Sequence, residues 1–431
     1  MPSQSSTQQR NAIIIIGILF FCFGFITWLN STLIPFLKIA CQLDNDIQAF
    51  FVTSAFYMAY FFLALPSAKI LEKVGYKKGM ALGLFIMAIG SLVFIPASYN
   101  RSFPLFLTGL FVQGMGLALL QTASNPYISI VGPIESAAKR ISMMGICNKL
   151  AGVLSPIILG AIVLKNAQSI ENNILSATDP LIREGLLGQL AQRIITPYII
   201  ITIVLVLLSV FILLSKLPEI NNPETAETPG IPEKNSILSF PHLLLGVVCL
   251  FFYVGVEVLA GDAIGTYGKA MGMSLDITKY FTAFTLGAML LGYIIGVFAI
   301  PKYLSQQQAL LGSAILGIIL SLGIYFTHGY VSITCIALLG LANALMWPAF
   351  FPLAIDGLGK FTQIGSALLI MGIAGGAIIP LLYTSMKDKL FIPNELSFFL
   401  CVFPAYVYIL YYATRGHKAG KLKMAVLKSG D

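Results

Sequence analysis

Long runs without a charged side chain are the dominant feature of this sequence. Lysine, arginine, aspartate and glutamate are all absent from residues 11–37, 47–68, 80–100, 102–134 and 303–355. A helix needs about 20 predominantly apolar residues to cross the hydrocarbon core of a membrane, and each run is at least that long. Charged residues make up only 10% of the chain, against about 25% in an ordinary soluble domain. A single water-soluble globule and a disordered chain are therefore both excluded.

We predict an all-α polytopic membrane protein with twelve transmembrane helices. A transmembrane β-barrel would instead show alternating segments of about ten residues, which the sequence lacks. The first apolar stretch is too long for a cleavable signal peptide and has no small-residue cleavage site. The expected spans cover residues 12–37, 47–71, 80–98, 103–131, 141–164, 194–216, 241–268, 278–300, 308–327, 331–355, 361–385 and 394–413.

The basic residues predict which side of the membrane the chain ends occupy. An even number of spans places both termini on one side. With both ends cytoplasmic, the inner segments hold 16 Lys and Arg residues against 9 in the outer segments. Cytoplasmic loops attract the excess of Lys and Arg, so we expect both termini in the cytoplasm. The net charge of +8 then reflects orientation and contact with anionic lipids, and it gives no case for nucleic-acid binding.

The chain divides into two halves of similar organisation. We expect an N-terminal six-helix bundle over residues 1–216, a polar cytoplasmic linker over 217–240, and a C-terminal six-helix bundle with a basic cytoplasmic tail over 241–431. Residues 165–193 are expected to form a long outer loop with room for a short helix. Matches between corresponding spans favour a structural repeat: FFCFG at 20–24 with FFYVG at 251–255, GLA at 116–118 and 340–342, and MGI at 144–146 and 371–373.

A polar segment between the second and third spans resembles the loop signature of the major facilitator superfamily. Residues 68–79 (AKILEKVGYKKG) contain Glu72, Gly75, Lys77 and Lys78 in the expected order. A glycine permits a tight turn, and the acid can pair with basic groups or with a helix end. We expect these four residues to form a conformational loop that latches the two halves in one state. The motif indicates a superfamily and not a substrate.

Three charged side chains lie inside expected spans and away from the span ends: Lys149 in the fifth, and Glu257 and Asp262 in the seventh. Such a group at the bilayer centre costs about 2.5–3.5 kcal/mol on insertion scales, which makes it a functional-site hypothesis by default. Burial favours the protonated form of a carboxylate. Glu257 is therefore the leading candidate for proton coupling, with Asp262 as the alternative and Lys149 as the counter-charge. The acids, five residues apart, do not share a face of a regular helix, and a structural ion pair is the competing interpretation.

Amides and an aromatic residue that suit a sugar lie in several spans. Amides pair with sugar hydroxyls as donors and acceptors, and an aromatic ring packs against the C–H face of the sugar. Spacings of three or four residues place pairs of these side chains on one face of the first, fourth and tenth spans. Each amide alone is more often a contact between helices, but together they draw on both halves. The expected substrate-binding residues are Thr27, Asn30, Gln121, Asn125, Asn148, Lys149, Asn343 and Trp347.

These segments resemble the fucose and glucose/galactose permease family of the major facilitator superfamily. The resemblance lies in residues 24–35 (GFITWLNSTLIP), 119–127 (LLQTASNPY), 131–133 (VGP), 253–257 (YVGVE) and 340–355. The segments GICNK at 145–149 and EVLAGD at 257–262 are similar to bacterial N-acetylglucosamine and glucose permeases. The resemblance implies an alternating-access sugar symporter, commonly driven by protons, in the bacterial inner membrane.

Two departures from the fucose permeases concern the coupling acid. Those permeases carry an Asp at the position of Ser31 and a Glu at the position of Gln121. The usual coupling acid is therefore absent here. We hypothesise that the proton-carrying role has moved to the seventh span, to Glu257 or Asp262, with Lys149 as the counter-charge.

The predicted function is cation symport, with H⁺ or possibly Na⁺, of glucose, galactose, N-acetylglucosamine or fucose. Two alternatives stay open: a proton-coupled drug or metabolite antiporter, which predicts an apolar cavity, and a sugar receptor that does not transport. We expect no enzymatic activity, cofactor or metal, because the sequence contains no P-loop, dinucleotide fingerprint or metal-ligand spacing. The expected partners are a sugar and the lipid bilayer, and the expected state is a monomer.

Overall fold

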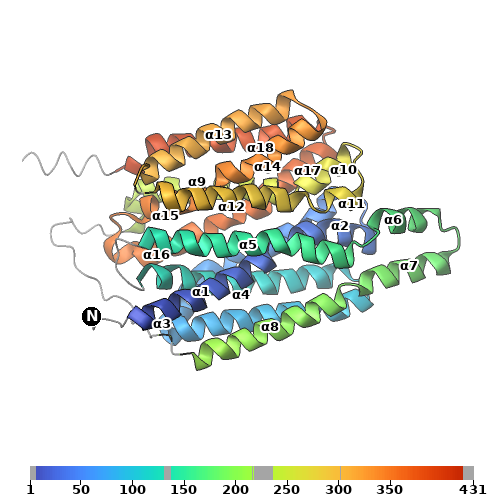
Figure 1. Cartoon of the computed structure of the whole chain (residues 1–431), viewed down its shortest axis with the longest axis horizontal. Helices are drawn as coiled ribbons and strands as arrows, with labels where there is room; N and C mark the ends of the chain where they lie inside the picture. Colours follow the sequence, from blue (N-terminus) through green and yellow to red (C-terminus); the bar gives the residue numbers. More distant parts are fainter. Residues whose placement is uncertain (1–5, 131–136, 216, 218–235, 301, 421–431) are drawn as a thin grey trace, which may run out of the picture.

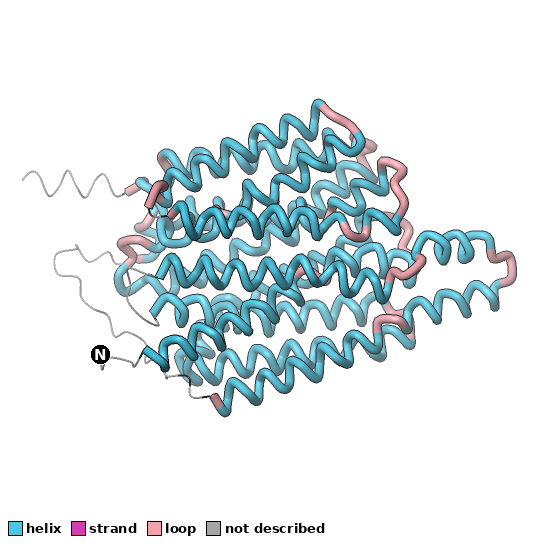
Figure 2. Tube along the Cα trace, viewed as in Figure 1, coloured by secondary structure: helices cyan, strands magenta, loops and turns pink. Residues whose placement is uncertain are grey.

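The computed structural model describes residues 6–130, 137–215, 217, 236–300 and 302–420, and within them every regular element is a helix (Figure 2). Eleven helical segments there are long and apolar enough to cross a membrane. One of them, α3 (Asp46–Tyr99), has 54 residues and holds two spans that meet at Gly75, whose φ of 77° breaks the helix. Because α3 counts twice, the predicted twelve-helix, all-α membrane architecture is confirmed.

Within its described residues, the first half of the chain forms eight helices. The first expected span is made of two consecutive helices, whereas the second and third expected spans share one continuous helix, α3, so helix numbers and span numbers differ. The helices are α1 (Ser6–Thr27), α2 (Asn30–Ala40), α3, α4 (Phe103–Ile130), α5 (Ala137–Val163), α6 (Ala167–Ser176), α7 (Pro180–Gln192) and α8 (Ile195–Leu214). We call these the N-terminal helix group.

In the part of the second half that the structure describes there are ten α-helices and four short 3₁₀ turns, which we call the C-terminal helix group. The α-helices are α9 (Pro241–Asp262), α10 (Ile264–Ala270), α11 (Leu275–Thr278), α12 (Phe281–Ala299), α13 (Gln306–Phe326), α14 (Gly329–Ala344), α15 (Met346–Ile355), α16 (Thr362–Met371), α17 (Gly375–Asp388) and α18 (Asn394–Thr414). The 3₁₀ turns are η2 (Ile237–Ser239), η3 (Gly359–Phe361), η4 (Gly372–Ala374) and η5 (Gly416–Lys418). Residues 218–235 of the expected linker lie outside the described residues, and the three domain boundaries stay predictions.

The two groups meet along two lines of contact. Within the groups, α3 packs on α4 and α8, α1 on α5, α12 on α14, and α13 on α14 and α18. Between the groups, α5 packs on α12, and α3 packs on α16 and α17 (Figure 1). Gly145 permits the close approach of α5 to α12, because a Cβ at that position would lie 2.3 Å from Cε1 of Tyr293.

Residues 165–193 form a helical hairpin rather than a loop with one short helix. The α6 and α7 helices project beyond the other helices at one end of the bundle (Figure 1). Asp179 begins α7 by accepting the backbone N–H of Leu181 at 2.8 Å, and Pro180 occupies the first helical position, where its missing N–H costs nothing. We call the end of the bundle from which α6 and α7 project the hairpin end. The first described helix, α1, begins at the opposite end (Figure 1).

Four spans are interrupted by short breaks. The first breaks at Trp28 and Leu29, between α1 and α2; the seventh at Ala263, between α9 and α10; the tenth at Leu345, between α14 and α15; and the eleventh at the 3₁₀ turn η4, between α16 and α17. Pro348 contributes to the third break, because it has no N–H to donate to the carbonyl four residues earlier. A side chain after a break no longer follows the face on which the helix began.

Candidate functional site

A central cavity of about 110 Å³ lies between the two helix groups. Both groups contribute polar and aromatic side chains to its wall. Of the predicted substrate-binding and coupling residues, those that line it are Thr27, Gln121, Asn125, Asn148, Lys149, Glu257 and Trp347. They come from α1, α4, α5, α9 and α15, so residues far apart in the sequence meet at one place.

A buried ion pair joins the two helix groups across this cavity. Nζ of Lys149 on α5 lies 2.6 Å from Oε1 of Glu257 on α9, and the two side chains are 8% and 11% exposed. Nζ of Lys149 also lies 4.9 Å from the centre of the Trp28 ring, within range of a cation–π contact. The prediction left Lys149 with a choice of two acids, and in this conformation it pairs with Glu257.

The Trp28 ring is held between two glycines. A Cβ at Gly152 on α5 would lie 2.6 Å from Cδ1 of Trp28, and a Cβ at Gly261 on α9 would lie 2.2 Å from Cζ3. Any larger residue at either position would occupy the space of the indole. The break between α1 and α2 thus places an aromatic ring between the groups, beside the ion pair.

The cavity amides keep hydrogen-bonding capacity for a ligand. Nε2 of Gln121 donates to the hydroxyl of Tyr60 at 3.1 Å, and Nδ2 of Asn148 donates to the carbonyl of Phe20 at 3.4 Å. A side-chain amide has two N–H donors and an oxygen acceptor. One contact each therefore leaves both amides able to bond a hydroxyl group in the cavity.

Aromatic residues form much of the wall, and the sequence reasoning missed most of them. The Trp347 ring stacks on Phe351, with ring centres 5.8 Å apart, and lies 6.4 Å from the Tyr253 ring. Aromatic residues are common in membrane spans, so their presence alone gave no warning. The available signal was tyrosine, because a hydroxyl inside an apolar span needs a partner. The missed residues are Phe20, Phe23, Trp28, Tyr57, Tyr60, Tyr253 and Tyr293.

Two predicted substrate residues do not line the cavity. Asn343 is 1% exposed and accepts a hydrogen bond from the hydroxyl of Tyr406 at 2.8 Å, whereas Trp347 faces the cavity. The two therefore do not share a face, because the helix breaks at Leu345 between them. Asn30 is also 1% exposed and lies outside the cavity wall, because the break after Thr27 redirects the chain.

Asp262 also lies away from the cavity wall. Its Oδ2 accepts a hydrogen bond from the hydroxyl of Thr53 on α3 at 3.1 Å, and its side chain is 2% exposed. Glu257 and Asp262 thus point in different directions, as their spacing indicates. The two candidate acids occupy different environments: one is paired with a lysine, and the other with a hydroxyl group of the opposite helix group.

In place of the predicted conformational loop, the structure has a kink in α3 at Gly75, with helix on both sides of it. Nζ of Lys77 donates to the backbone carbonyl of Ser215 at 2.6 Å, at the end of α8. Glu72 and Lys78 are exposed. The Lys77 contact stays within the N-terminal helix group, so the latching role of this loop stays a prediction.

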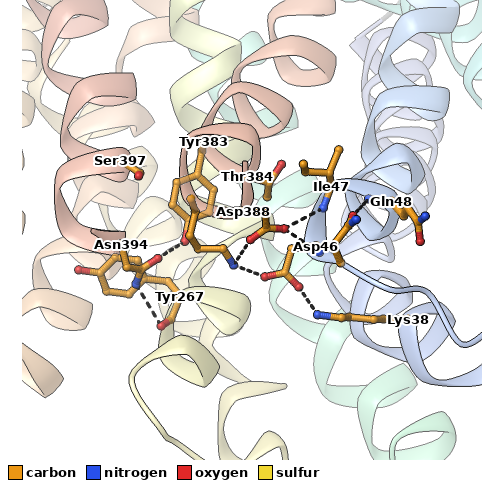
Figure 3. Close-up of polar contacts among 12 residues, drawn as sticks. Lys38, Asp46, Ile47, Gln48, Tyr267, Tyr383, Thr384, Asp388, Asn394 and Ser397 are labelled. Carbon is orange, nitrogen blue, oxygen red and sulfur yellow. Dashed lines mark hydrogen bonds and ion pairs between the residues drawn. The ribbon is translucent and has the colours of Figure 1, made fainter. Parts of the chain in front are cut away.

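Contacts between the groups concentrate at the hairpin end, in a charged cluster that the sequence reasoning did not single out (Figure 3). Asp46, the first residue of α3, forms ion pairs with Lys38 and with Lys387 near the end of α17. Asp388 accepts the backbone N–H groups of Asp46 at 2.9 Å and Ile47 at 3.3 Å. We call Lys38, Asp46, Lys387 and Asp388 the end cluster. Charged residues at span ends are ordinary, so no pattern in the sequence indicates this arrangement.

The hairpin adds a second connection at the same end. Nζ of Lys269 on α10 lies 2.6 and 2.9 Å from the two carboxylate oxygens of Glu171 on α6. The backbone N–H of Ala167 donates to Asp276 at 3.2 Å. Beneath these contacts is a second cavity of about 250 Å³, the hairpin-end vestibule, which is lined by residues that include Ser31, Lys38, Asp46, Thr266, Lys269, Lys279 and Lys387.

Comparisons with known proteins agree with this geometry. Residues 16–381 match the family model described as Major Facilitator Superfamily. A glucose/galactose transporter of Brucella abortus is 33% identical over 426 residues, which are 97% of this chain and 98% of that protein. The L-fucose-proton symporter of Escherichia coli is 28% identical over 86% of each chain. A crystal structure of the transporter FucP in the outward conformation superimposes with a TM-score of 0.74 and 25% identity, covering 95% of this chain and 99% of that one.

Proposed function

The chain belongs to the Major Facilitator Superfamily and, within it, to the family of glucose/galactose and fucose permeases, and from this premise we propose that it is a sugar–proton symporter. The substrate is a neutral hexose or an N-acetylhexosamine. The coupling ion is H⁺, and transport proceeds by alternating access. The protein is an integral membrane protein, and we place it in the bacterial inner membrane as a monomer with both termini in the cytoplasm.

The observation that carries this proposal is the composition of the central cavity. The same cavity is lined by the amide side chains of Gln121, Asn125 and Asn148 and by two tryptophans, Trp28 and Trp347. Sugar hydroxyls need paired donors and acceptors, and the C–H faces of a sugar ring need an aromatic surface. A cavity for an apolar drug would not require three amides. This composition favours a sugar over the alternative of a drug or metabolite antiporter.

Contributions from both helix groups support transport over simple sugar binding. The Lys149–Glu257 pair joins α5 to α9, and the end cluster joins α2 and α3 to α17. A ligand that favours one arrangement of two groups can shift the equilibrium between arrangements only by its differential affinity for them. A site shared between the groups provides that differential affinity. A non-transporting receptor is the second candidate, and it needs no such sharing.

Uptake into proteoliposomes tests the proposal. The purified protein is reconstituted and given labelled D-glucose, D-galactose, N-acetyl-D-glucosamine or L-fucose under an inward proton gradient, an inward sodium gradient or neither. A sugar symporter accumulates one of these sugars above the external concentration under the proton gradient, and a protonophore abolishes the accumulation. Accumulation under the sodium gradient alone would replace H⁺ by Na⁺. Binding without uptake would favour the receptor, and proton-driven extrusion of a dye would favour the antiporter.

A further inference from the structure

Asp262 lies in the wall between the central cavity and the hairpin-end vestibule. Four residues before it, Val258 lines the cavity, and four residues after it, Thr266 lines the vestibule. Its partner Thr53 also lies between the two cavities. On α3, Tyr57, about one turn after Thr53, lines the central cavity, and Asp46, the first residue of the helix, lines the vestibule. One turn of helix is about 5.4 Å. Asp262 is thus within about one helical turn of both compartments.

The carboxyl group at this position is buried and incompletely bonded. Asp262 is 2% exposed, and its Oδ2 accepts the Thr53 hydroxyl at 3.1 Å. Its Oδ1 has no hydrogen-bond partner among the described residues. An ionised carboxylate that is this deeply buried and has no ion-pair partner among the described residues is poorly stabilised. A carboxylic acid needs less solvation and supplies a donor of its own.

The charged groups on the surrounding elements are balanced by other partners. On α9 itself, Glu257 pairs with Lys149 of α5. In the vestibule, Lys38 of α2 pairs with Asp46, and Lys279 pairs with Asp276. The titratable group from α3 is the Tyr57 hydroxyl, and α12 contributes two threonine hydroxyls that donate to backbone carbonyls of α9. Within the described residues, no ion pair includes Asp262.

We propose that Asp262 binds the transported proton and that the Lys149–Glu257 pair stays ionised throughout the cycle. This inference rests on the proposed sugar–proton symport. Protonation of Glu257 would leave Lys149 buried without its counter-charge, which is strongly unfavourable. Protonation of Asp262 removes a buried charge that has no ion-pair partner in the part of the chain that the structure describes. The two acids therefore have different roles: Glu257 holds Lys149 beside the sugar site, and Asp262 carries the proton.

The position of Asp262 links the proton to the closing of the wall. When the helix groups separate at the hairpin end, the contact with Thr53 breaks and the carboxylate takes a proton from hydronium in the vestibule, forming an O–H bond. The neutral acid then allows the wall to close. Release breaks that O–H bond and passes the proton to water in the central cavity. The carboxylate that remains favours separation again, so one proton crosses in the direction of the sugar.

Transport by Asp262→Asn tests the assignment. The sugar is the one that the wild type takes up best from the panel of glucose, galactose, N-acetylglucosamine and fucose. The variant should keep sugar exchange under equal concentrations within about twofold of the wild type. It should lose accumulation under a proton gradient and lose the sugar-dependent acidification of vesicles loaded with a pH dye. Asp179→Asn is the matched control, because Asp179 is exposed on the hairpin and asparagine caps a helix equally well.

The outcomes separate this inference from the proposed function. If the wild type accumulates sugar with protons and Asp262→Asn does the same, the inference is overturned while the symport stands. If the wild type neither exchanges nor accumulates any sugar of the panel, the proposed function fails. If Asp262→Asn does not fold, Thr53→Val removes the hydrogen-bond donor while leaving the acid, and it should shift the pH at which accumulation is half-maximal.

A distance measurement tests the same link without any sugar. Spin labels are placed at the exposed residues Asp44 and Lys389, which lie near the hairpin end in opposite helix groups, and their separation is measured by pulsed electron resonance at pH 5 and pH 8. In the otherwise unmutated protein, the longer separation should gain population at pH 8. With Asp262→Asn added, the shorter separation should dominate at both values. An unchanged pH response in the variant would contradict the proposal.

Discussion

The carboxylate of Asp388, the last residue of α17, accepts the backbone N–H of Asp46 at 2.9 Å, at the first residue of α3 (Figure 3). The N-terminal turn of a helix has N–H groups without partners inside the helix. Here two of them are satisfied by a side chain from the opposite helix group. Asp388 therefore caps the N-terminus of α3 from the opposite helix group, in addition to Asn45, whose side chain accepts the backbone N–H of Gln48. Separation of the two groups would break the Asp388 cap.

Removing this cap should favour separation at the hairpin end. Asp388→Ala takes away the acceptor for the N–H groups of Asp46 and Ile47. Loss of an N-cap costs about 1 kcal/mol, which changes the ratio of two conformations about fivefold. We expect the distance between spin labels at the hairpin end to shift toward longer values by that ratio. Asp388→Asn keeps an oxygen acceptor and is the control, and equal shifts in both variants would show that charge, rather than the cap, holds the end closed.

The Lys149–Glu257 pair should show strong coupling between its two members. Either Lys149→Gln or Glu257→Gln leaves one buried charge without its partner, and this costs about 3 kcal/mol. The double variant replaces the pair by two amides and should recover most of that loss. Thermal unfolding of the four proteins in one detergent measures the coupling. If the stability loss of the double variant equals the sum of the two single losses, Lys149 and Glu257 do not interact directly, and Lys149 would have another anion as its partner.

Sequence periodicity could predict the membrane fold because each span is apolar along its whole length. It could also predict the turn at Gly75, because the motif requires a glycine there. It could not place side chains beyond a break in a helix. Asn30 follows the break at Trp28 and Leu29, and Asn343 lies before the break at Leu345. A continuous helix puts both on the cavity face, whereas the observed backbone buries both away from the cavity wall.

The sequence also could not show which acid pairs with Lys149. Lys149 had two acids within the same span of the other half, and helix spacing shows only that they face different ways. Distances decide the matter: Glu257 lies 2.6 Å from Lys149, and Asp262 is bonded to Thr53 instead. The end cluster was less predictable still. Asp46 and Asp388 are 342 positions apart, and each alone is an ordinary charged residue at the end of a span.

Two asparagines, one in the fourth span and one in the tenth, should affect different properties when each is replaced by alanine. Asn125 lines the cavity, and Asn343 bonds Tyr406 away from it. Asn343→Ala leaves the buried hydroxyl of Tyr406 without its acceptor, so we expect a loss of about 1–3 kcal/mol of stability and an unchanged Kd for sugar. Asn125→Ala should raise the Kd about tenfold, which corresponds to 1.4 kcal/mol of lost binding. Calorimetric titration of sugar and thermal unfolding give the two readouts. A weakened Kd in Asn343→Ala would return that residue to the substrate site.

Close packing of helices within the C-terminal group should depend on two glycines. A Cβ at Gly375 on α17 would lie 1.8 Å from the carbonyl oxygen of Phe251, and a Cβ at Gly340 on α14 would lie 2.0 Å from that of Thr285. Both obstacles are backbone atoms, which cannot rotate away. Alanine at either position must push two helices apart, and overpacking of this kind costs about 1–3 kcal/mol. We expect a lower unfolding temperature for each variant in detergent.

A third glycine provides the control for this prediction. Gly287 lies in α12, and a Cβ there would have no atom within 4 Å. Alanine is favoured over glycine inside a helix by about 1 kcal/mol, so Gly287→Ala should unfold at the same or a higher temperature. The same substitution thus has opposite expected signs at Gly287 and Gly340. Equal destabilisation at both positions would mean that helix distortion, rather than contact between helices, determines the cost.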